Sequence, residues 1–179
     1  MAYQLTEEQG PWMIFAASFA GEGANQDAHR LVLELRSRYQ LRAYVHVKHY
    51  DFSDPVTGNG YNKYLEPKRM RYARDYEYDE VAVLVGDFGS VSEPAVNDAL
   101  ELLKHAYPKS LQIGNDEETT LRYAGLRSVQ RRILGDDEKK RQGPMGKAFV
   151  TRNPLLPAEY FVPRGLDDFV VSINKGVKY

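Results

Sequence analysis

Two apolar runs in this chain share one pattern. Residues 12–19 and 81–88 are almost entirely apolar, and they end in Ser18-Phe19 and Asp87-Phe88 respectively. A strand with polar residues on one side only would alternate in polarity. These runs are apolar on both sides, which predicts two central strands of a sheet covered on both faces. In the first run the alternation places Trp12, Ile14 and Ala16 on one face and Met13, Phe15 and Phe19 on the other.

A helical pattern follows each apolar run. In both stretches the apolar residues recur every three or four positions, which predicts one helix to about Tyr39 and another that ends by Tyr107-Pro108. The two patterns match at a constant offset of 68 residues, so they predict a repeated strand–turn–helix unit. The matching pairs are Ala28 and Val96, Leu31 and Ala99, Val32 and Leu100, Leu35 and Leu103, and Tyr39 and Tyr107.

Residues 41–50 alternate strictly, which predicts a half-exposed strand near a sheet edge. The apolar face holds Leu41, Ala43, Val45 and Val47, and the other face holds Arg42, Tyr44, His46, Lys48 and Tyr50.

Two insertions separate these elements. Residues 51–79 contain five of the 13 tyrosines and several turn sequences, and Glu66-Pro67 predicts a short helix over 68–74. Residues 109–146 contain a third helical pattern, with apolar residues at Tyr123, Leu126, Val129 and Ile133. A last strand is predicted over 147–151.

The order β-α-β, insertion, β-α, insertion, β predicts an α+β fold of the ferredoxin-like split βαβ type (βαββαβ) with a four-stranded antiparallel sheet. One domain over residues 1–153 is expected, with insertions at about 51–79 and 109–146. The proline-rich residues 154–179 are expected to run as an extended tail that leads into a further repeat. Leu155, Leu156, Tyr160, Phe161 and Phe169 are expected to anchor this tail.

Composition narrows the function classes. The net charge is −1, from 24 basic and 25 acidic residues, so nothing global favours nucleic acid or an anionic surface. The chain has no cysteine, which excludes disulfides and thiolate chemistry. No membrane span and no signal peptide are predicted. We expect a cytoplasmic protein if Met1 is the native start, and a periplasmic or cell-envelope protein if the chain is part of a longer exported one.

No motif predicts catalysis, a metal or a cofactor. His46 and His49 have a spacing that chelates metals on helices, but on a strand they point to opposite faces. Gly21-Glu22-Gly23 lacks the remaining residues of a phosphate loop. Ser18 and Asp87 lie at equivalent strand ends, with no histidine predicted beside either. We therefore expect a protein that is not an enzyme.

The two apolar runs resemble the SPOR (sporulation-related repeat) family, small βαββαβ domains of bacterial cell envelopes. The family opens with Val-Gln-Val-Gly-Ser-Phe, which is similar to Ile14-Phe15-Ala16-Ala17-Ser18-Phe19 in this chain. A later strand of the family, Val-Arg-Val-Gly-Pro-Phe, is similar to Val83-Leu84-Val85-Gly86-Asp87-Phe88. The resemblance covers residues 11–50 and 80–108 and implies binding of peptidoglycan glycan strands on the open sheet face.

Three positions depart from the family. Its glutamine matches Phe15, its arginine matches Leu84 and its first glycine matches Ala17. An apolar sheet face in water promotes aggregation, so we expect this face to be covered by the 51–79 insertion, the tail or a partner.

Two hypotheses follow. The first is a non-enzymatic binding or structural module of the bacterial cell envelope with a SPOR-like core, whose sheet face is covered or used for protein interaction. Its partners would be a protein, further repeats of the chain or peptidoglycan glycan. The second is an RNA- or nucleotide-binding ferredoxin-like domain that uses Tyr44, His46, Lys48 and the basic 63–74 segment. The candidate ligand-binding residues are Tyr44, His46, Lys48 and Tyr50. An enzyme with a site built from the two insertions is a third option.

Overall fold

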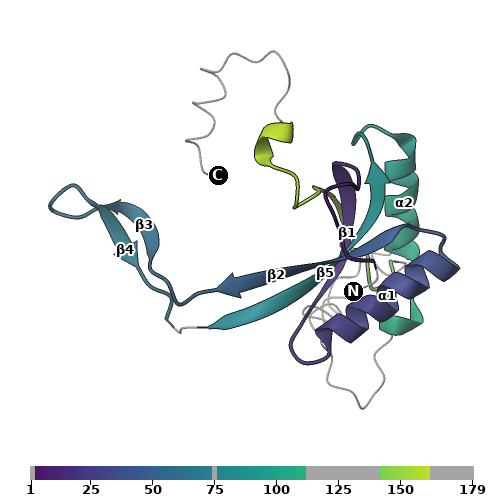
Figure 1. Cartoon of the computed structure of the whole chain (residues 1–179), viewed down its shortest axis with the longest axis horizontal. Coiled ribbons are helices and arrows are strands. Elements are labelled where there is room, and N and C mark those ends of the chain that lie inside the picture. Colours follow the sequence, from purple (N-terminus) through teal and green to yellow (C-terminus); the bar gives the residue numbers. More distant parts are fainter. Residues whose placement is uncertain (1–2, 74–75, 112–141, 162–179) are drawn as a thin grey trace.

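Four antiparallel strands form the centre of the molecule, in the order β2-β5-β1-β6 (Figure 1). The structure, a computed structural model, describes residues 3–73, 76–111 and 142–161. The sheet consists of β1 (Trp12–Ala20), β2 (Ala43–Asp51), β5 (Glu77–Phe88) and β6 (Phe149–Arg152). The predicted α+β class and four-stranded antiparallel sheet are confirmed, with the two apolar runs in the central strands and the alternating segment at an edge.

Two helices and several short elements complete the described chain. The helices are α1 (Ala24–Arg38) and α2 (Pro94–His105), and two 3-10 helices are η1 (Lys109–Leu111) and η2 (Ala158–Phe161). A separate two-stranded ribbon consists of β3 (Val56–Tyr61) and β4 (Pro67–Met70). Among the described residues, no helix has the length and apolar character that a membrane crossing requires.

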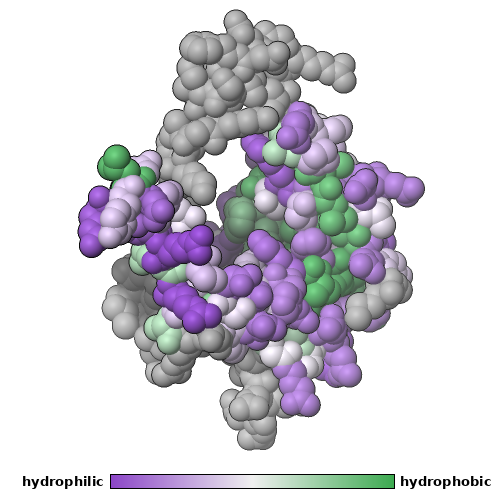
Figure 2. All heavy atoms as spheres, turned by 60° about the vertical axis from the view of Figure 1, so that its left-hand side comes forward, coloured by the Kyte–Doolittle hydropathy of each residue, from purple (hydrophilic) through white to green (hydrophobic). Residues whose placement is uncertain are grey.

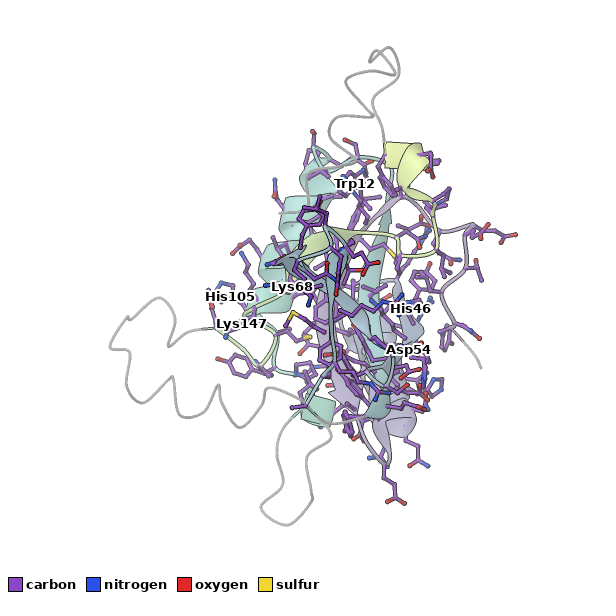
Figure 3. The ribbon with its side chains drawn as sticks, turned by 90° about the vertical axis from the view of Figure 1, so that its left-hand side faces the viewer. Trp12, His46, Asp54, Lys68, His105 and Lys147 are labelled. Atoms are coloured by element: carbon purple, nitrogen blue, oxygen red, sulfur yellow. The ribbon has the colours of Figure 1, made fainter. Side chains whose placement is uncertain are left out.

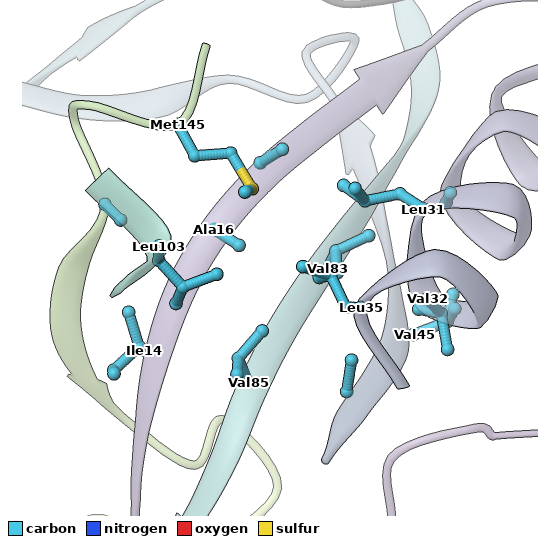
Figure 4. Close-up of a cluster of buried hydrophobic side chains, with 14 of the residues drawn as sticks. Ile14, Ala16, Leu31, Val32, Leu35, Val45, Val83, Val85, Leu103 and Met145 are labelled. Atoms are coloured by element: carbon cyan, nitrogen blue, oxygen red, sulfur yellow. The ribbon is translucent and has the colours of Figure 1, made fainter. Parts of the chain in front are cut away.

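The main core lies between the helices and one face of the sheet (Figure 4). Leu31 and Leu35 of α1 and Leu103 of α2 are fully buried against alternate residues of the central strands. The paired positions Leu35 and Leu103 of the predicted repeat thus occupy the same core. Met145, just before β6, closes this core.

A β-bulge in β1 corrects one predicted face. Phe15 pairs with Leu84 but Ala17 pairs with Val83, so Ala16 is an extra residue in the strand. Such an insertion shifts every later side chain to the other face. Phe19 therefore lies in the helix-side core, and not beside Met13 and Phe15 as strict alternation predicts.

The first predicted insertion forms a long arm. Beyond the body of the sheet, β2 and β5 continue as a two-stranded ribbon, and the β3–β4 hairpin lies at its end (Figure 1). The predicted helix over 68–74 is wrong, because Pro67–Met70 pairs with β3 as a strand. A proline is tolerated as the first residue of a strand, and it begins β4 here.

Several predictions fall partly outside the described residues. The third helix, with Tyr123, Leu126, Val129 and Ile133, lies entirely outside them, and so does Phe169. The described tail is not fully extended, since it contains η2. It is anchored by Phe161, whose ring meets Trp12 edge-on with the centroids 5.5 Å apart.

A half-buried carboxylate joins α1 to η1. Glu34 accepts hydrogen bonds from the backbone N–H groups of Lys109 and Ser110, at 2.8 and 3.0 Å, and from the Ser110 hydroxyl. Its side chain is only 16% exposed. Burial acts to raise its pKa, but the hydrogen bonds from Ser110, Lys109 and Arg38 outweigh burial, so the pKa lies below its ordinary value of 4.5.

We expect Glu34→Gln to lower the free energy of unfolding at pH 7 by about 2 kcal/mol, because hydrogen bonds to a charged acceptor are lost. The folded pKa is lower than the unfolded one. The stability due to the charge is therefore present above pH 4.5 and is lost as the pH falls through the folded pKa. Urea denaturation at pH 7 and at decreasing pH should show the difference between the two proteins shrinking below pH 4.5. The exposed Glu22→Gln is the control, and a difference independent of pH would contradict the assignment.

Candidate functional site

The face of the sheet away from the helices carries one row of apolar residues across all four strands. Phe149 of β6 pairs with Phe15 of β1, Phe15 pairs with Leu84 of β5, and Leu84 pairs with Tyr44 of β2. Phe15 and Leu84, the two positions that are polar in the SPOR family, are thus direct cross-strand neighbours. The rings of Phe15 and Phe149 stack with their centroids 5.2 Å apart.

The centre of this row is covered by the protein's own chain. Leu5, from the segment before β1, joins Met13, Tyr44 and Leu84 in a second buried cluster, and Leu155 of the tail packs against it. Leu84 is 3% exposed, whereas Phe149 at the end of the row is 53% exposed. The expected cover therefore exists, but it comes from Leu5 and the tail. The insertion projects away from the body (Figure 1).

One buried amide holds both covering segments together. Asn153 is 1% exposed, and its Nδ2 donates to the carbonyl oxygens of Thr6, Gln9 and Gly10 at 3.2–3.5 Å. Its Oδ1 accepts from the backbone N–H of Leu155 at 3.1 Å. The backbone of Leu5 also bonds to Val45, which covers the outer edge of β2. The cover is therefore a fixed part of the fold.

The four predicted ligand-binding residues share this face of β2 but differ in access. Tyr44 is buried under the cover, His46 is half-buried, and Lys48 is exposed. The Nζ atom of Lys48 lies 4.7 Å from the centre of the Tyr50 ring. Only the outer three residues of the predicted set can therefore be reached from solvent in this structure.

Beyond His46, the same face continues along the arm as a cluster of aromatic rings. We call it the ring cluster, and it consists of Tyr50, Phe52, Tyr72, Tyr76 and Tyr78. Tyr50 and Tyr78 are a cross-strand pair, with near-parallel rings whose centroids are 5.2 Å apart. Phe52 meets the Tyr72 ring edge-on at 4.8 Å. Tyr76 is 60% exposed, so the cluster is a solvent-facing surface.

The electrostatics differ between the two faces of the arm. Burial, with the charge of Lys48 as a second cause, lowers the pKa of His46, so this histidine is neutral at pH 7. On the other face, His49 bonds to Asp79 at 2.7 Å, and that carboxylate raises the pKa of His49. The two histidines of the predicted pair therefore lie in different surroundings, and Asp79 is the partner of His49 alone.

Within the described part of the chain, no hydrogen bond or ion pair joins Ser18 or Asp87 to a histidine. Ser18, Ala82 and His46 lie in one row of the sheet, so Ser18 and His46 are separated by a whole strand. Adjacent strands lie about 4.8 Å apart, so the backbones of these two residues are roughly 10 Å apart. Asp87 is engaged by Arg42 and by the backbone N–H of Gly10.

No group of three or more metal-ligating side chains gathers within residues 3–73, 76–111 and 142–161. Figure 3 shows His46 and His105 on opposite sides of the sheet.

Two functional residues were missed by sequence reasoning. Leu5 is a single apolar residue in a polar segment, and the partners of the Asn153 Nδ2 group lie more than 140 residues away in sequence. Proline residues at 154 and 157 marked the tail as irregular, but no sequence signal connected it to residues 5–10.

Comparisons with known proteins add no assignment. No protein-family model matches the chain, and no curated protein or solved structure matches it either.

We expect Asn153→Ala to lower the free energy of unfolding by about 1–3 kcal/mol, because three carbonyl groups and one N–H lose their buried partner. It should also loosen the cover over Leu84 and expose apolar surface. A dye that fluoresces when it binds apolar surface should therefore give a stronger signal with this variant. The exposed helical Asn97→Ala serves as the control. Unchanged stability and dye binding in Asn153→Ala would show that the cover does not depend on this amide.

Proposed function

We propose that this protein is a non-enzymatic binding module of the bacterial cell envelope with a SPOR-like core, and that its arm contacts a protein partner. The core is a ferredoxin-like split βαβ domain with the arm inserted between its second and third strands. The order β2-β5-β1-β6 and the packing of both helices on one face support this fold. The resemblance of residues 14–19 and 83–88 to SPOR strands supports the family and the compartment.

One observation carries the proposal: the sheet face where the family binds glycan is filled. A glycan strand would need the surface around Phe15 and Leu84, but Leu84 and Tyr44 are buried beneath Leu5. Hydroxyl groups of a sugar that reached this apolar row would find no partner, and desolvating them is unfavourable. Glycan binding at this face would therefore require polar side chains at positions 15 and 84, and it would also require removal of the cover.

The ring cluster is the largest group of aromatic side chains on the same face, and it is left exposed to solvent at Tyr72 and Tyr76. Tyrosine is enriched at protein interfaces because its large ring buries apolar area while its hydroxyl group stays hydrogen-bonded. The stacking of Tyr50, Phe52 and Tyr78 already restricts these rings, so less side-chain entropy is lost on binding. A partner bound here would rest on a preorganised surface.

A second candidate function is binding of single-stranded RNA. Its support is the combination of exposed rings with Lys48 and the basic end of the arm, since rings stack on bases and cations bind phosphates. Burial of Tyr44 removes one of the three strand residues on which this candidate is based, besides the basic 63–74 segment.

A photo-crosslinking residue at position 76 tests the protein partner in cells. We expect a discrete cross-linked protein from position 76 and none from position 91, which is also exposed but lies far from the arm in sequence. The product should disappear in a Tyr50→Ser, Tyr78→Ser variant, which removes the stacked pair. Equal products from both positions would contradict a specific partner.

Two binding assays separate the alternatives. The purified chain should not be retained by peptidoglycan sacculi, since the glycan face is filled. It should show no salt-dependent binding to a short single-stranded oligonucleotide. Retention by sacculi would restore the family function, and salt-dependent oligonucleotide binding that Tyr50→Ser abolishes would favour the RNA candidate.

A further inference from the structure

The end of the arm exposes large apolar and aromatic side chains that no described residue covers. Leu65 is 83% exposed, Tyr64 is 71% exposed and Tyr61 is 67% exposed. Met70 of β4, beside them, is 56% exposed. We call residues 61–71 the tip. It is the part of the described chain that lies farthest from the body of the sheet (Figure 1).

The turn at the tip is rigidly built. Asn62 Oδ1 accepts hydrogen bonds from the backbone N–H groups of Tyr64 and Glu66 at 2.8 and 3.0 Å. The backbone of Asn62 pairs with that of Glu66, and the N–H of Leu65 donates to the Asn62 carbonyl. Leu65 has a φ of 62°, a left-handed conformation that is unfavourable for a leucine. An exposed leucine held this way by four hydrogen bonds of one turn, two of them to the Asn62 side chain, indicates a presented side chain.

Three of the four cations of the tip follow the turn: Lys68 and Arg69 in β4, and Arg71 just after it. The fourth, Lys63, lies in the turn itself, with its Nζ atom 4.9 Å from the centre of the Tyr64 ring. The single acidic residue of the tip is Glu66. The Glu66 carboxylate accepts a hydrogen bond from Asn62 Nδ2 at 3.0 Å, so it helps to build the turn. No ion pair to these four cations occurs within the described parts of the chain. Figure 2 shows strongly hydrophilic side chains on the arm where it comes forward.

We propose that the tip is a membrane-surface anchor, which inserts Leu65 and Tyr64 into the interfacial region of an anionic lipid bilayer. Its cations then lie at the level of the lipid phosphates. This inference goes beyond the proposed function, because it concerns a different surface and a different partner.

The layout of the hairpin fits this partner. Leu65 lies in the turn of residues 62–66, and Lys68 is the second residue of β4, so Lys68 lies behind the turn on the side of the sheet. Apolar groups of interfacial segments enter a membrane to a depth of about 5–10 Å, where they meet the boundary between headgroups and acyl chains. Tyrosine and the long stems of lysine and arginine suit the same layer.

The order of side chains favours lipid over nucleic acid or an acidic protein. The most exposed large apolar side chain in the described chain is Leu65, an aliphatic residue that neither stacks on a base nor pairs with a carboxylate. Lys68, Arg69 and Arg71 lie behind it, where they match a charged layer above an apolar one. In a nucleic-acid site the phosphates would instead meet the cations first.

Co-sedimentation with vesicles tests the anchor on the full chain. We expect binding to vesicles of phosphatidylglycerol and phosphatidylcholine and no binding to vesicles of phosphatidylcholine alone. Raising the salt concentration should weaken binding, because exposed charges are screened. Leu65→Ser should weaken it by about 10-fold, since the inserted aliphatic group is lost. The control Leu33→Ser removes a leucine of α1 that is 44% exposed, and it should leave binding unchanged.

A charge variant and a control variant complete the test. Lys68→Gln with Arg69→Gln should also weaken vesicle binding, and circular dichroism should show the fold intact. Equal binding by Leu65→Ser and the unaltered chain would overturn the anchor, as would tip-dependent binding to an oligonucleotide in place of vesicles. The Tyr50→Ser, Tyr78→Ser variant should still bind vesicles, which separates failure of the anchor from failure of the proposed protein contact.

Discussion

The rest of the structure depends on one constraint: the central strands β1 and β5 are apolar on both faces. Each fully buried aliphatic side chain contributes about 1.5–3 kcal/mol, so neither face of this sheet can be left in water. The two helices satisfy the constraint on one side through Leu31, Leu35 and Leu103. On the other side it is satisfied by Leu5 and Leu155, which are single residues from segments far apart in sequence. The same constraint that stabilises the sheet therefore closes the centre of the sheet face opposite the helices, and it leaves the ring cluster of the arm exposed.

The coarse fold could be predicted because it follows from polarity patterns. Apolar runs on both faces gave the central strands, and the alternation over 41–50 gave the edge strand. The errors occur where local and tertiary preferences conflict. Glu66-Pro67 is a typical helix start, yet pairing with β3 makes Pro67–Met70 a strand. The bulge at Ala16 leaves no trace in composition, because alanine at both 16 and 17 is compatible with either face.

The candidate site could be predicted only in part. The apolar character of Phe15 and Leu84 predicted a cover, and the structure supplies one. Its source could not be predicted, since Asn153 reaches the carbonyl groups of residues 6–10 across more than 140 residues of sequence. Tyrosines were evident in the 51–79 segment, but the ring cluster depends on the register that sets Tyr50 opposite Tyr78. Register of this kind is decided by tertiary pairing and not by local pattern.

The origin of the cover also determines the order in which the protein can assemble. Strands β1, β2 and β5 and both helices are complete by residue 105, whereas Asn153 and Leu155 come after the last strand. During synthesis the sheet can thus form before Asn153 and Leu155 are available to complete the cover, because N-terminal parts of a chain fold first. Completing the cover then requires Asn153 to reach the carbonyl groups of residues 6–10, which is slow because the loop is long. Until then, of the two covering leucines, Leu5 alone can pack on Met13 and Leu84, and an apolar face that is not fully covered favours aggregation.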